Sequence, residues 1–494
     1  MLKRWTHSHQ LPVILAVIVA GMWRLWLMPR YAGWEESDYG NLAMIQGVLD
    51  SGFQHFDMNH MPGYYGIAAL VHALVDDAVI AGRGVSWLGG LTALGLATAL
   101  ATRMGGARAG WVTGALLVIQ PELALYSSSS LREPLAAAFI LGALSSMSRE
   151  RMGWAGFCAA GAFLVRFDSA LVLLPVLAIH ALGREGARNR LFRSWIPLGV
   201  AIFLWALYCR VDHGTWAFWS HSVSVNVETG MGGEAEAPSE WWWNGVEVSA
   251  ALLSWLLPWR IGWAVWMGFI WCMIRSVSVG HGIRRTMVLQ GMLMLGLWSG
   301  IGFVGQHAPS HNLYWKWLCP IVPVVVPLAV VGLWEAVDRA ERWMGGTGAR
   351  ALLGVAIVQV AVSNARETER QRALSESWYR PQLELAQWIE AEIGVDEALV
   401  LDNIPACWIR RRATERQMVS WFDIPVHEDE GSGFAQWLRE NDVRWVLWYR
   451  EDWTQAPRVA PFLSEGGRWS SNGVTLNERR REDGYGWIWY EVEP

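Results

Sequence analysis

Residues 11–28 read LPVILAVIVAGMWRLWLM, an apolar run long enough to cross a bilayer as a helix. Lys3 and Arg4 precede this run, as they would in a signal peptide, but no small-residue cleavage site follows it. The run ends instead in Trp23-Arg24-Leu25-Trp26, a pattern typical of an anchor at the membrane interface. We therefore expect an uncleaved first transmembrane helix. Similar apolar runs recur as far as residue 363, and this recurrence decides the fold class.

The composition supports a membrane protein with a soluble tail. Hydrophobic residues make up 53% of the 494 residues, and only 17% are charged, against roughly 25% in a typical soluble protein. These values exclude a disordered chain and an ordinary cytosolic enzyme. The 5 cysteines show neither disulfide nor zinc-site spacing, and the net charge of −5 gives no reason to expect nucleic acid as a partner.

The apolar runs predict about eleven transmembrane helices. They cover residues 11–28, 85–102, 110–126, 133–148, 152–165, 168–183, 195–209, 252–274, 286–304, 318–335 and 350–363. A further apolar run at 64–80 decides the topology. If it crosses the membrane, every later loop lies on the opposite side of the membrane. A helix at 64–80 that lies along the outer surface leaves most Lys and Arg residues in inner loops, as the positive-inside rule requires. We therefore expect a cytoplasmic N-terminus.

Two domains follow from this topology. Residues 1–363 form the predicted membrane domain, with a first outer loop at 29–84 and a long outer loop at 210–250. Residues 364–494 form a small extracytoplasmic α/β domain, because patterns typical of helices and buried strands alternate there. Its predicted helices cover 381–394 and 433–441, and its predicted strands cover 398–402, 443–449 and 484–492. The Arg- and Trp-rich, Lys-poor composition favours a multi-pass protein of a bacterial inner membrane.

Unusual polar residues gather on the predicted outer side. They are Glu35, Glu36, Asp38, His60, Arg132, Glu133, Arg166, Asp168, Asp212, His213, His307, His311 and Lys316. Ionisable groups concentrated at one membrane boundary indicate a functional site. The strongest local pattern is Trp34-Glu-Glu-Ser-Asp-Tyr39, where three neighbouring carboxylates repel one another and are costly near lipid.

The order of motifs after the first helix carries a family resemblance. Glu35 and Glu36 are followed by Tyr39, a short helical stretch, Gly52, and the segment Pro62-Gly-Tyr-Tyr65. This order resembles the lipid-linked-sugar glycosyltransferases of the GT-C fold, which include protein mannosyltransferases and the aminoarabinose transferases of lipid A. Their first outer loop carries an Asp-Glu-x-x-Tyr motif, and this chain has Glu in place of Asp.

Three later segments extend the resemblance over nearly the whole chain. Ser130-Leu-Arg-Glu-Pro134 resembles the second outer loop of the family, and Leu164-Val-Arg-Phe-Asp168 resembles its turn between two helices. Asn312-Leu-Tyr-Trp-Lys316, with Pro320 and Pro323 after it, resembles a late Arg-Tyr…Pro…Pro segment. The resemblance implies transfer of a sugar from a polyprenyl-phosphate donor to a hydroxyl of a glycan, lipid or protein on the extracytoplasmic side.

Such a reaction assigns roles to the polar residues. The leaving group is already an anionic phosphate, so one carboxylate that deprotonates the acceptor is sufficient, unlike the two that a glycoside hydrolase needs. A single in-line attack then inverts the anomeric centre. We expect Glu35 to be the base, with Glu36 or Asp38 in support and Glu133 assisting or holding a metal. The predicted substrate contacts are Tyr39, His60, Tyr64, Arg132, Arg166, Arg260, Lys316, Trp241 and Trp242, with Lys316 and Arg166 as phosphate partners.

Several alternatives stay open at this point. Arg132 and Arg166 could simply extend toward water from helix ends, and Trp241 and Trp242 could anchor the membrane interface instead of stacking on a sugar. No tight metal-ligand spacing exists, so no cofactor is certain and a divalent cation between a histidine and Glu133 is undecided. The main alternative function is a transporter or flippase of lipid-linked or small polar substrates, which should show inverted repeats and polar groups at mid-membrane. A membrane scaffold without catalytic activity is a third.

Overall fold

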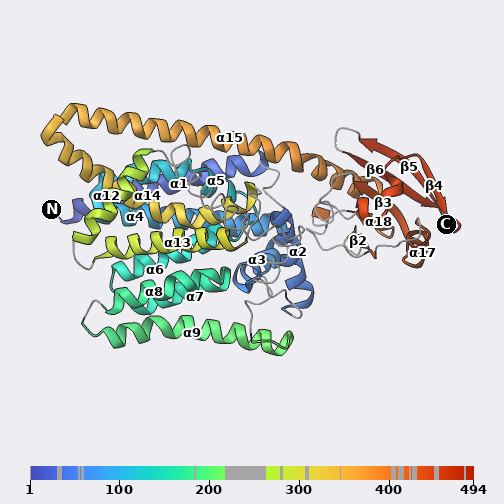
Figure 1. The fold of residues 1–494 in the computed structure, drawn as a ribbon, viewed down its shortest axis with the longest axis horizontal. Coiled ribbons are helices and arrows are strands. Elements are labelled where there is room, and N and C mark those ends of the chain that lie inside the picture. The colour runs from blue at the N-terminus through green and yellow to red at the C-terminus, as the bar shows by residue number, and fades with distance from the viewer. Residues whose placement is uncertain are drawn as a thin grey trace, which may run out of the picture.

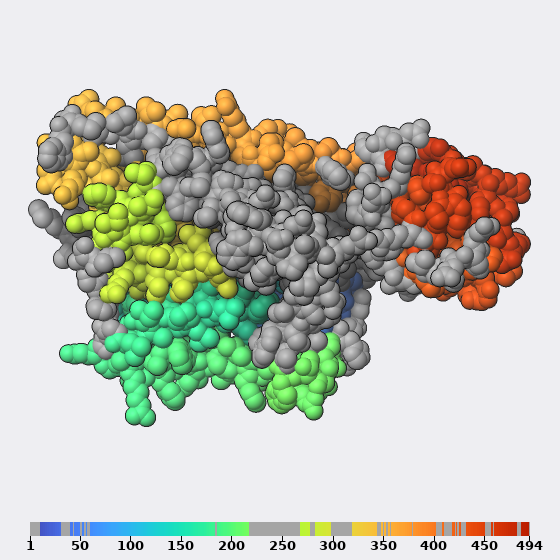
Figure 2. Space-filling view, viewed as in Figure 1, coloured from blue at the N-terminus to red at the C-terminus, as the bar shows by residue number. Residues whose placement is uncertain are grey.

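The computed structural model has two parts, a long helical bundle and a small sheet domain that projects from one end of it (Figures 1 and 2). The beginning of α1 lies at the other end of the bundle, and α2 and α3 lie at the end nearer the sheet domain (Figure 1). The structure describes residues 2–30, 36–53, 56, 60–182, 185–216, 263–278, 282–305, 311–344, 346–401, 408–409, 417–421, 424–425, 431–449, 456–482 and 486–493.

The described helices follow the predicted apolar runs closely. They are α1 (Leu2–Leu27), η1 (Met28–Arg30), α2 (Glu36–Ser51), α3 (Pro62–Val75), α4 (Ala78–Val118), α5 (Pro121–Tyr126), α6 (Glu133–Ser148), α7 (Met152–Val165), α8 (Asp168–Leu182), α9 (Ala187–Asp212), α12 (Trp263–Ser278), α13 (Ile283–Gly305), α14 (His311–Met344) and α15 (Gly346–Glu392). Within the described residues, 4 helical segments are both long and apolar enough to cross a membrane on their own. The chain is thus an α-helical polytopic membrane protein, and the number of eleven crossings stays a prediction.

Helix α4 is a hairpin of two arms. Gly106 has φ 78° and ψ −177°, a backbone conformation that only glycine adopts readily, and it interrupts the helix. A Cβ atom on Gly114 would lie 3.5 Å from the side chain of Thr98. Residues 98 and 114 would be about 24 Å apart in one continuous helix, so the chain reverses at Gly106. The predicted separate crossings at 85–102 and 110–126 correspond to these two arms, although the second arm ends at Val118.

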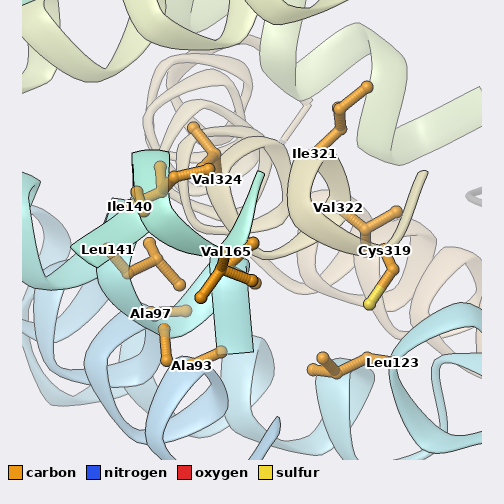
Figure 3. Packing of buried hydrophobic residues seen from close by; sticks show 14 of the residues in the cluster. Ala93, Ala97, Leu123, Ile140, Leu141, Val165, Cys319, Ile321, Val322 and Val324 are labelled. Atoms are coloured by element: carbon orange, nitrogen blue, oxygen red, sulfur yellow. The ribbon is translucent and has the colours of Figure 1, made fainter. Parts of the chain in front are cut away.

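Helix α14 forms the centre of the bundle. Its segment 319–331 is buried throughout, and the helix packs against α4, α6, α12 and α13. Figure 3 shows Cys319, Ile321, Val322 and Val324 of this helix beside residues of α4, α5 and α6. Pro320, Pro323 and Pro327 lie inside the helix and cannot donate their backbone hydrogen bonds, which leaves carbonyl groups of the preceding turn without their usual helical partner.

Helix α15 connects the bundle to the sheet domain without a break. It runs through residue 364, where the composition shifts, and the helix predicted at 381–394 is its last part. Leu385 and Ile389 on this part pack with Leu399 and Trp489 against one face of the sheet. The amphipathic α17 (Ser432–Glu440) covers the other face, with Phe434 in its core. Apolar side chains on both faces of the strands therefore explain why two helices enclose the sheet.

The sheet has six strands in the order β2-β1-β3-β6-β5-β4. The strands are β1 (Ala398–Leu401), β2 (Met418–Ser420), β3 (Val443–Tyr449), β4 (Arg468–Ser471), β5 (Val474–Glu482) and β6 (Trp487–Glu493), with α18 (Ala456–Val459) and η4 (Pro461–Leu463) after β3. β1 pairs in parallel with β2 and β3, and the remaining neighbours are antiparallel. The predicted strands correspond to β1, β3 and β6, and the α/β class is confirmed.

Candidate active site

Three charged side chains meet where α6 and α8 begin. Arg166 lies in the two-residue turn between α7 and α8, and its Nη1 donates to Glu133 Oε1 over 2.7 Å. Its Nη2 donates to Asp168 Oδ2 over 2.9 Å, and its Nε donates to Asp168 Oδ1 over 3.3 Å. The pairing with Asp168 is thus bidentate, the geometry in which a guanidinium binds a carboxylate most strongly. We call Glu133, Arg166 and Asp168 the carboxylate–arginine cluster.

The cluster is buried and negatively charged overall. The exposed fractions of the Glu133, Arg166 and Asp168 side chains are 2%, 9% and 8%. Glu133 is the first residue of α6 and Asp168 is the first residue of α8, so the positive ends of two helix dipoles stabilise both carboxylates. Glu133 Oε2 is also buried and accepts no hydrogen bond from any described residue. A carboxylate oxygen held in this way is available to a polar group that enters the site.

Arg132 adds a second cation at the edge of the cluster. It precedes α6, and its Nε lies 3.9 Å from Glu133 Oε1. Its side chain is 24% exposed, so it reaches the surface while Arg166 does not. Of the two arginines, Arg132 is therefore the better placed for an incoming anion.

Side chains of α2 and α3 are tied to the turn that precedes this cluster. Asn41 of α2 donates from Nδ2 to the carbonyl oxygen of Ser130 over 2.7 Å, and Tyr65 of α3 donates to Asn41 Oδ1 over 2.6 Å. Ser86 donates to the carbonyl oxygen of Leu131, and Tyr64 Oη lies 3.2 Å from Ser86 Oγ. These buried bonds hold Asn41, in the second turn of α2, at the same end of the bundle as Glu133.

The end of α9 holds the loop that follows α2, at Phe53 and Phe56. Tyr208 Oη lies 2.6 Å from the carbonyl oxygen of Phe53 and accepts the backbone N–H of Phe56 at 3.0 Å. His213 Nε2 lies 2.8 Å from the carbonyl oxygen of Phe56 and 3.3 Å from Asp212 Oδ2. Asp212 and His213, two of the predicted outer-face residues, thus support the loop.

Gln290 of α13 is a member of the site that the sequence did not reveal. It is fully buried, and neither atom of its amide has a hydrogen-bond partner among the described residues. It lines a small cavity together with Arg166, Asp168, Ser169 and Pro320. A single glutamine in an apolar run has no distinctive sequence pattern, so only the packing of α13 on α8 reveals it.

Other buried polar residues of the bundle lie outside the cluster. Arg24 of α1 is fully buried and donates from Nη1 to the carbonyl oxygen of Ala20 over 3.2 Å. Gln120 donates to Glu122, and Asn364 of α15 donates to Gln120 Oε1 over 2.9 Å. Neighbouring helices enclose Arg24, while Trp26 is 44% exposed, and the interfacial anchor expected at Trp23-Arg-Leu-Trp26 stays a prediction. Gln120 and Glu122 interrupt an apolar run, and this polar pair could have shown from the sequence that buried polar groups lie there.

The predicted site residues have different outcomes. Glu133, Arg132 and Arg166 lie together, while Tyr64 is a buried support and the ring of His60 packs against Tyr65 at 5.6 Å. The backbones of four others are described, and their side chains lie outside the described part: Glu36, Asp38 and Tyr39 in the first turn of α2, and Lys316 in α14. Glu35, Arg260, Trp241 and Trp242 lie outside the described residues. Arg166 is not extended toward water, because two carboxylates bind it inside the protein.

The described residues do not form a metal site. They contain no group of three or more His, Cys, Asp or Glu side chains that could hold an ion. The Glu133 and Asp168 carboxylates both bind Arg166, whose positive charge opposes a metal at the same position.

Solved structures share this arrangement of helices and sheet. The chain superposes on ArnT from Cupriavidus metallidurans bound to undecaprenyl phosphate with a TM-score of 0.63 and 13% identity, over 97% of both chains. The apo state of that protein gives 0.60 and 14%, again over 97% of both chains. An Archaeoglobus fulgidus oligosaccharyltransferase, crystallised with Zn and sulfate, gives 0.52 and 12% over 88% of this chain and 67% of its own. No protein-family model and no curated protein matches the sequence. The chain has the GT-C fold.

Proposed function

We propose that the chain is a membrane glycosyltransferase that moves a sugar from a polyprenyl-phosphate donor to an acceptor hydroxyl on the extracytoplasmic side. The observation that carries this proposal is the Asn41–Ser130 hydrogen bond, which joins the start of α2 to the turn before Glu133. This bond holds the second turn of α2 next to the turn before Glu133, and it supports our proposal that the first-loop carboxylates and the carboxylate–arginine cluster act at one end of the bundle. The GT-C fold, which ArnT bound to undecaprenyl phosphate shares, supports the donor class.

The proposed reaction is a single in-line displacement. The acceptor oxygen attacks the anomeric carbon, and the bond from that carbon to the phosphate oxygen breaks with its electron pair. The proton of the acceptor hydroxyl passes to a carboxylate, for which we propose Glu35, with Glu36 or Asp38 orienting the acceptor. Inversion of the anomeric centre follows, because attack and departure occur on opposite faces of the sugar.

The departing polyprenyl phosphate needs positive charge near its oxygens. Arg132 and Lys316 are the cations that we assign to this phosphate, since Arg132 reaches the surface beside Glu133. For Arg166 the contacts favour a positioning role, because Glu133 and Asp168 occupy three of its donor directions. Arg166 then holds the Glu133 carboxylate at a fixed position, where its second oxygen can bind a hydroxyl of donor or acceptor.

A transporter or flippase remains the contrasting hypothesis. It would move its substrate across the bilayer and leave the sugar–phosphate bond intact. The buried Arg24, Glu122 and Gln290 are the polar groups within the bundle that it would use. The transferase breaks that bond, so the chemical state of the lipid-linked sugar separates the two functions.

The experiment compares a strain that lacks this chain with the same strain carrying variants of it. Mass spectrometry of lipid-linked sugars and envelope glycans should find a lipid-linked sugar that accumulates on the outer side and a glycan that loses that sugar. Wild-type protein restores the glycan, and replacement of the base should reduce transfer by about 10²- to 10⁴-fold. Glu35→Gln, Glu36→Gln, Asp38→Asn and Glu133→Gln are assayed separately.

Glu341→Gln is the matched control. Glu341 lies near the end of α14 and pairs with Arg350 of α15, so the variant removes a carboxylate that does not belong to the candidate site. It should transfer sugar at the wild-type rate. Full transfer by all four site variants at normal expression would exclude the mechanism. Accumulation of intact lipid-linked sugar on the inner side of the membrane would instead assign the chain to transport.

A further inference from the structure

A second cavity, of about 150 Å³, lies between α8 and α13. His180, Arg285 and Thr286 form its polar edge, and Val176, Ile179 and Leu289 form its apolar floor. The cavity is separate from the carboxylate–arginine cluster, because His180 follows Asp168 by about 18 Å along α8. It therefore lies toward the end of the bundle that the charge distribution places on the cytoplasmic side.

The polar edge is built from side chains in defined positions. His180 and Thr286 are buried, and His180 Nδ1 lies 2.9 Å from Thr286 Oγ1. This bond joins α8 to α13 at the cavity wall. The hydroxyl and the imidazole together can donate to and accept from a polar ligand.

Two neighbouring arginines at the start of α13 differ in their partners. Arg284 pairs with Glu335 of α14, which neutralises its charge. Arg285 lines the cavity, and no described carboxylate forms an ion pair with it. Among the described residues, therefore, no ion pair compensates the positive charge of Arg285 at the cavity. Charge complementarity points to an anionic ligand.

The floor of the cavity points to a ligand that is also apolar. Ile179 is 46% exposed and Leu182 is 64% exposed, so the outer side of α8 faces acyl chains in a membrane. An ion such as free phosphate would satisfy Arg285 and leave Ile179 and Leu289 without an apolar partner. A phospholipid suits both the polar edge and the apolar floor, with its phosphate at Arg285 and its acyl chain along the floor.

We propose that this cavity binds the headgroup of an anionic glycerophospholipid from the inner leaflet. The lipid phosphate contacts Arg285, a headgroup or glycerol hydroxyl contacts the His180–Thr286 pair, and an acyl chain covers Ile179. The lipid then holds α8 against α13, the two helices that carry Asp168 and Gln290. Binding does not depend on the reaction proposed above, so it is tested without any assay of sugar transfer.

The experiment uses the purified full-length protein in detergent, with native mass spectrometry for bound lipid and thermal unfolding for stabilisation. Dioleoyl-phosphatidylglycerol, dioleoyl-phosphatidylcholine and inorganic phosphate are added separately. Phosphatidylglycerol should bind about fivefold more tightly than phosphatidylcholine and raise the unfolding temperature. Arg285→Gln should remove this preference. Ile179→Trp, which fills the cavity and keeps every charge, should also weaken phosphatidylglycerol binding.

Arg275→Gln is the matched control, because it removes an exposed arginine from the end of α12 and does not line the cavity. It should keep the preference for the anionic lipid. Equal binding of the two lipids by the wild-type protein would overturn the proposal. Equal losses in Arg285→Gln and Arg275→Gln would also overturn it, since they would indicate general attraction to anionic surfaces. Stabilisation by inorganic phosphate as large as that by the lipid would assign the cavity to a free anion.

Discussion

Arg166 and Arg24 are both buried in the helical bundle, but their surroundings differ in charge. Arg166 binds two carboxylates, Glu133 and Asp168, at the beginnings of two helices. Arg24 lies inside α1, where the described residues offer it only the carbonyl oxygens of Ala20 and Leu117, and its Nε donates to no described acceptor. The same side chain is thus part of an ion cluster in one region and an isolated charge in the other.

The difference shows what each region can tolerate. A buried ion cluster is held together by the charges of its members, so removing one member leaves the others without compensation. An isolated buried charge contributes no such attraction, and its desolvation costs free energy that the fold must supply from elsewhere. The same substitution should therefore destabilise the protein at Arg166 and should not destabilise it at Arg24.

Arg166→Met should have the largest effect. It leaves the Glu133 and Asp168 carboxylates buried without their cation, and the free energy of unfolding should fall by about 3–5 kcal/mol. Thermal unfolding in detergent measures this loss. Arg132→Met is the control, because its side chain is 24% exposed and lies 3.9 Å from Glu133, so a change of less than about 1 kcal/mol is expected. Equal losses for the two variants would contradict the view that Arg166 is the centre of the cluster.

Arg24→Met should be neutral or should raise the free energy of unfolding by up to about 2 kcal/mol, because an apolar side chain of similar length replaces an isolated buried charge. The same unfolding measurement applies. Arg30→Met is the control. Arg30 is exposed at the end of η1 and stacks on Trp26 at 4.3 Å, so its replacement should change the free energy of unfolding little. A loss above about 1 kcal/mol for Arg24→Met would show that an acid outside the described residues pairs with Arg24.

The fold could be predicted from the sequence where the hydrophobic pattern is long. The runs at 133–148, 152–165 and 168–183 correspond to α6, α7 and α8 within one residue, because short polar turns separate them. The hairpin of β4 and β5 was not predicted, although Asn472-Gly473 between them is a strong turn signal, and both residues have positive φ. The many charged residues of β5, such as Arg479, concealed the alternation of apolar and polar side chains that is typical of a strand.

The candidate site could be predicted only in part, for a related reason. Glu133 and Arg166 are recognisable because they interrupt apolar runs at helix ends, where a charge is unexpected. Their bond joins residues 33 positions apart and depends on how α6 packs against α7. Gln290 and Arg24 lie inside runs that read as ordinary membrane helices, and their burial depends on neighbours from distant segments. A one-dimensional pattern does not contain that information.

Gln290→Met should have the smallest effect on stability. It tests whether Gln290 belongs to the cluster around Arg166 or, like Arg24, to the isolated buried groups. Its amide is buried without a described partner and, like Arg24, pairs with no described charge, yet it lines the same cavity as Arg166 and Asp168. Methionine removes two unsatisfied polar atoms, so the free energy of unfolding should rise by about 1 kcal/mol or stay unchanged. If the amide reaches the cluster through a bound water, the variant should destabilise by about 1–2 kcal/mol instead. A double-mutant cycle with Asp168→Asn then decides: coupling above about 0.5 kcal/mol places Gln290 in the cluster, and additive effects place it with the isolated buried groups.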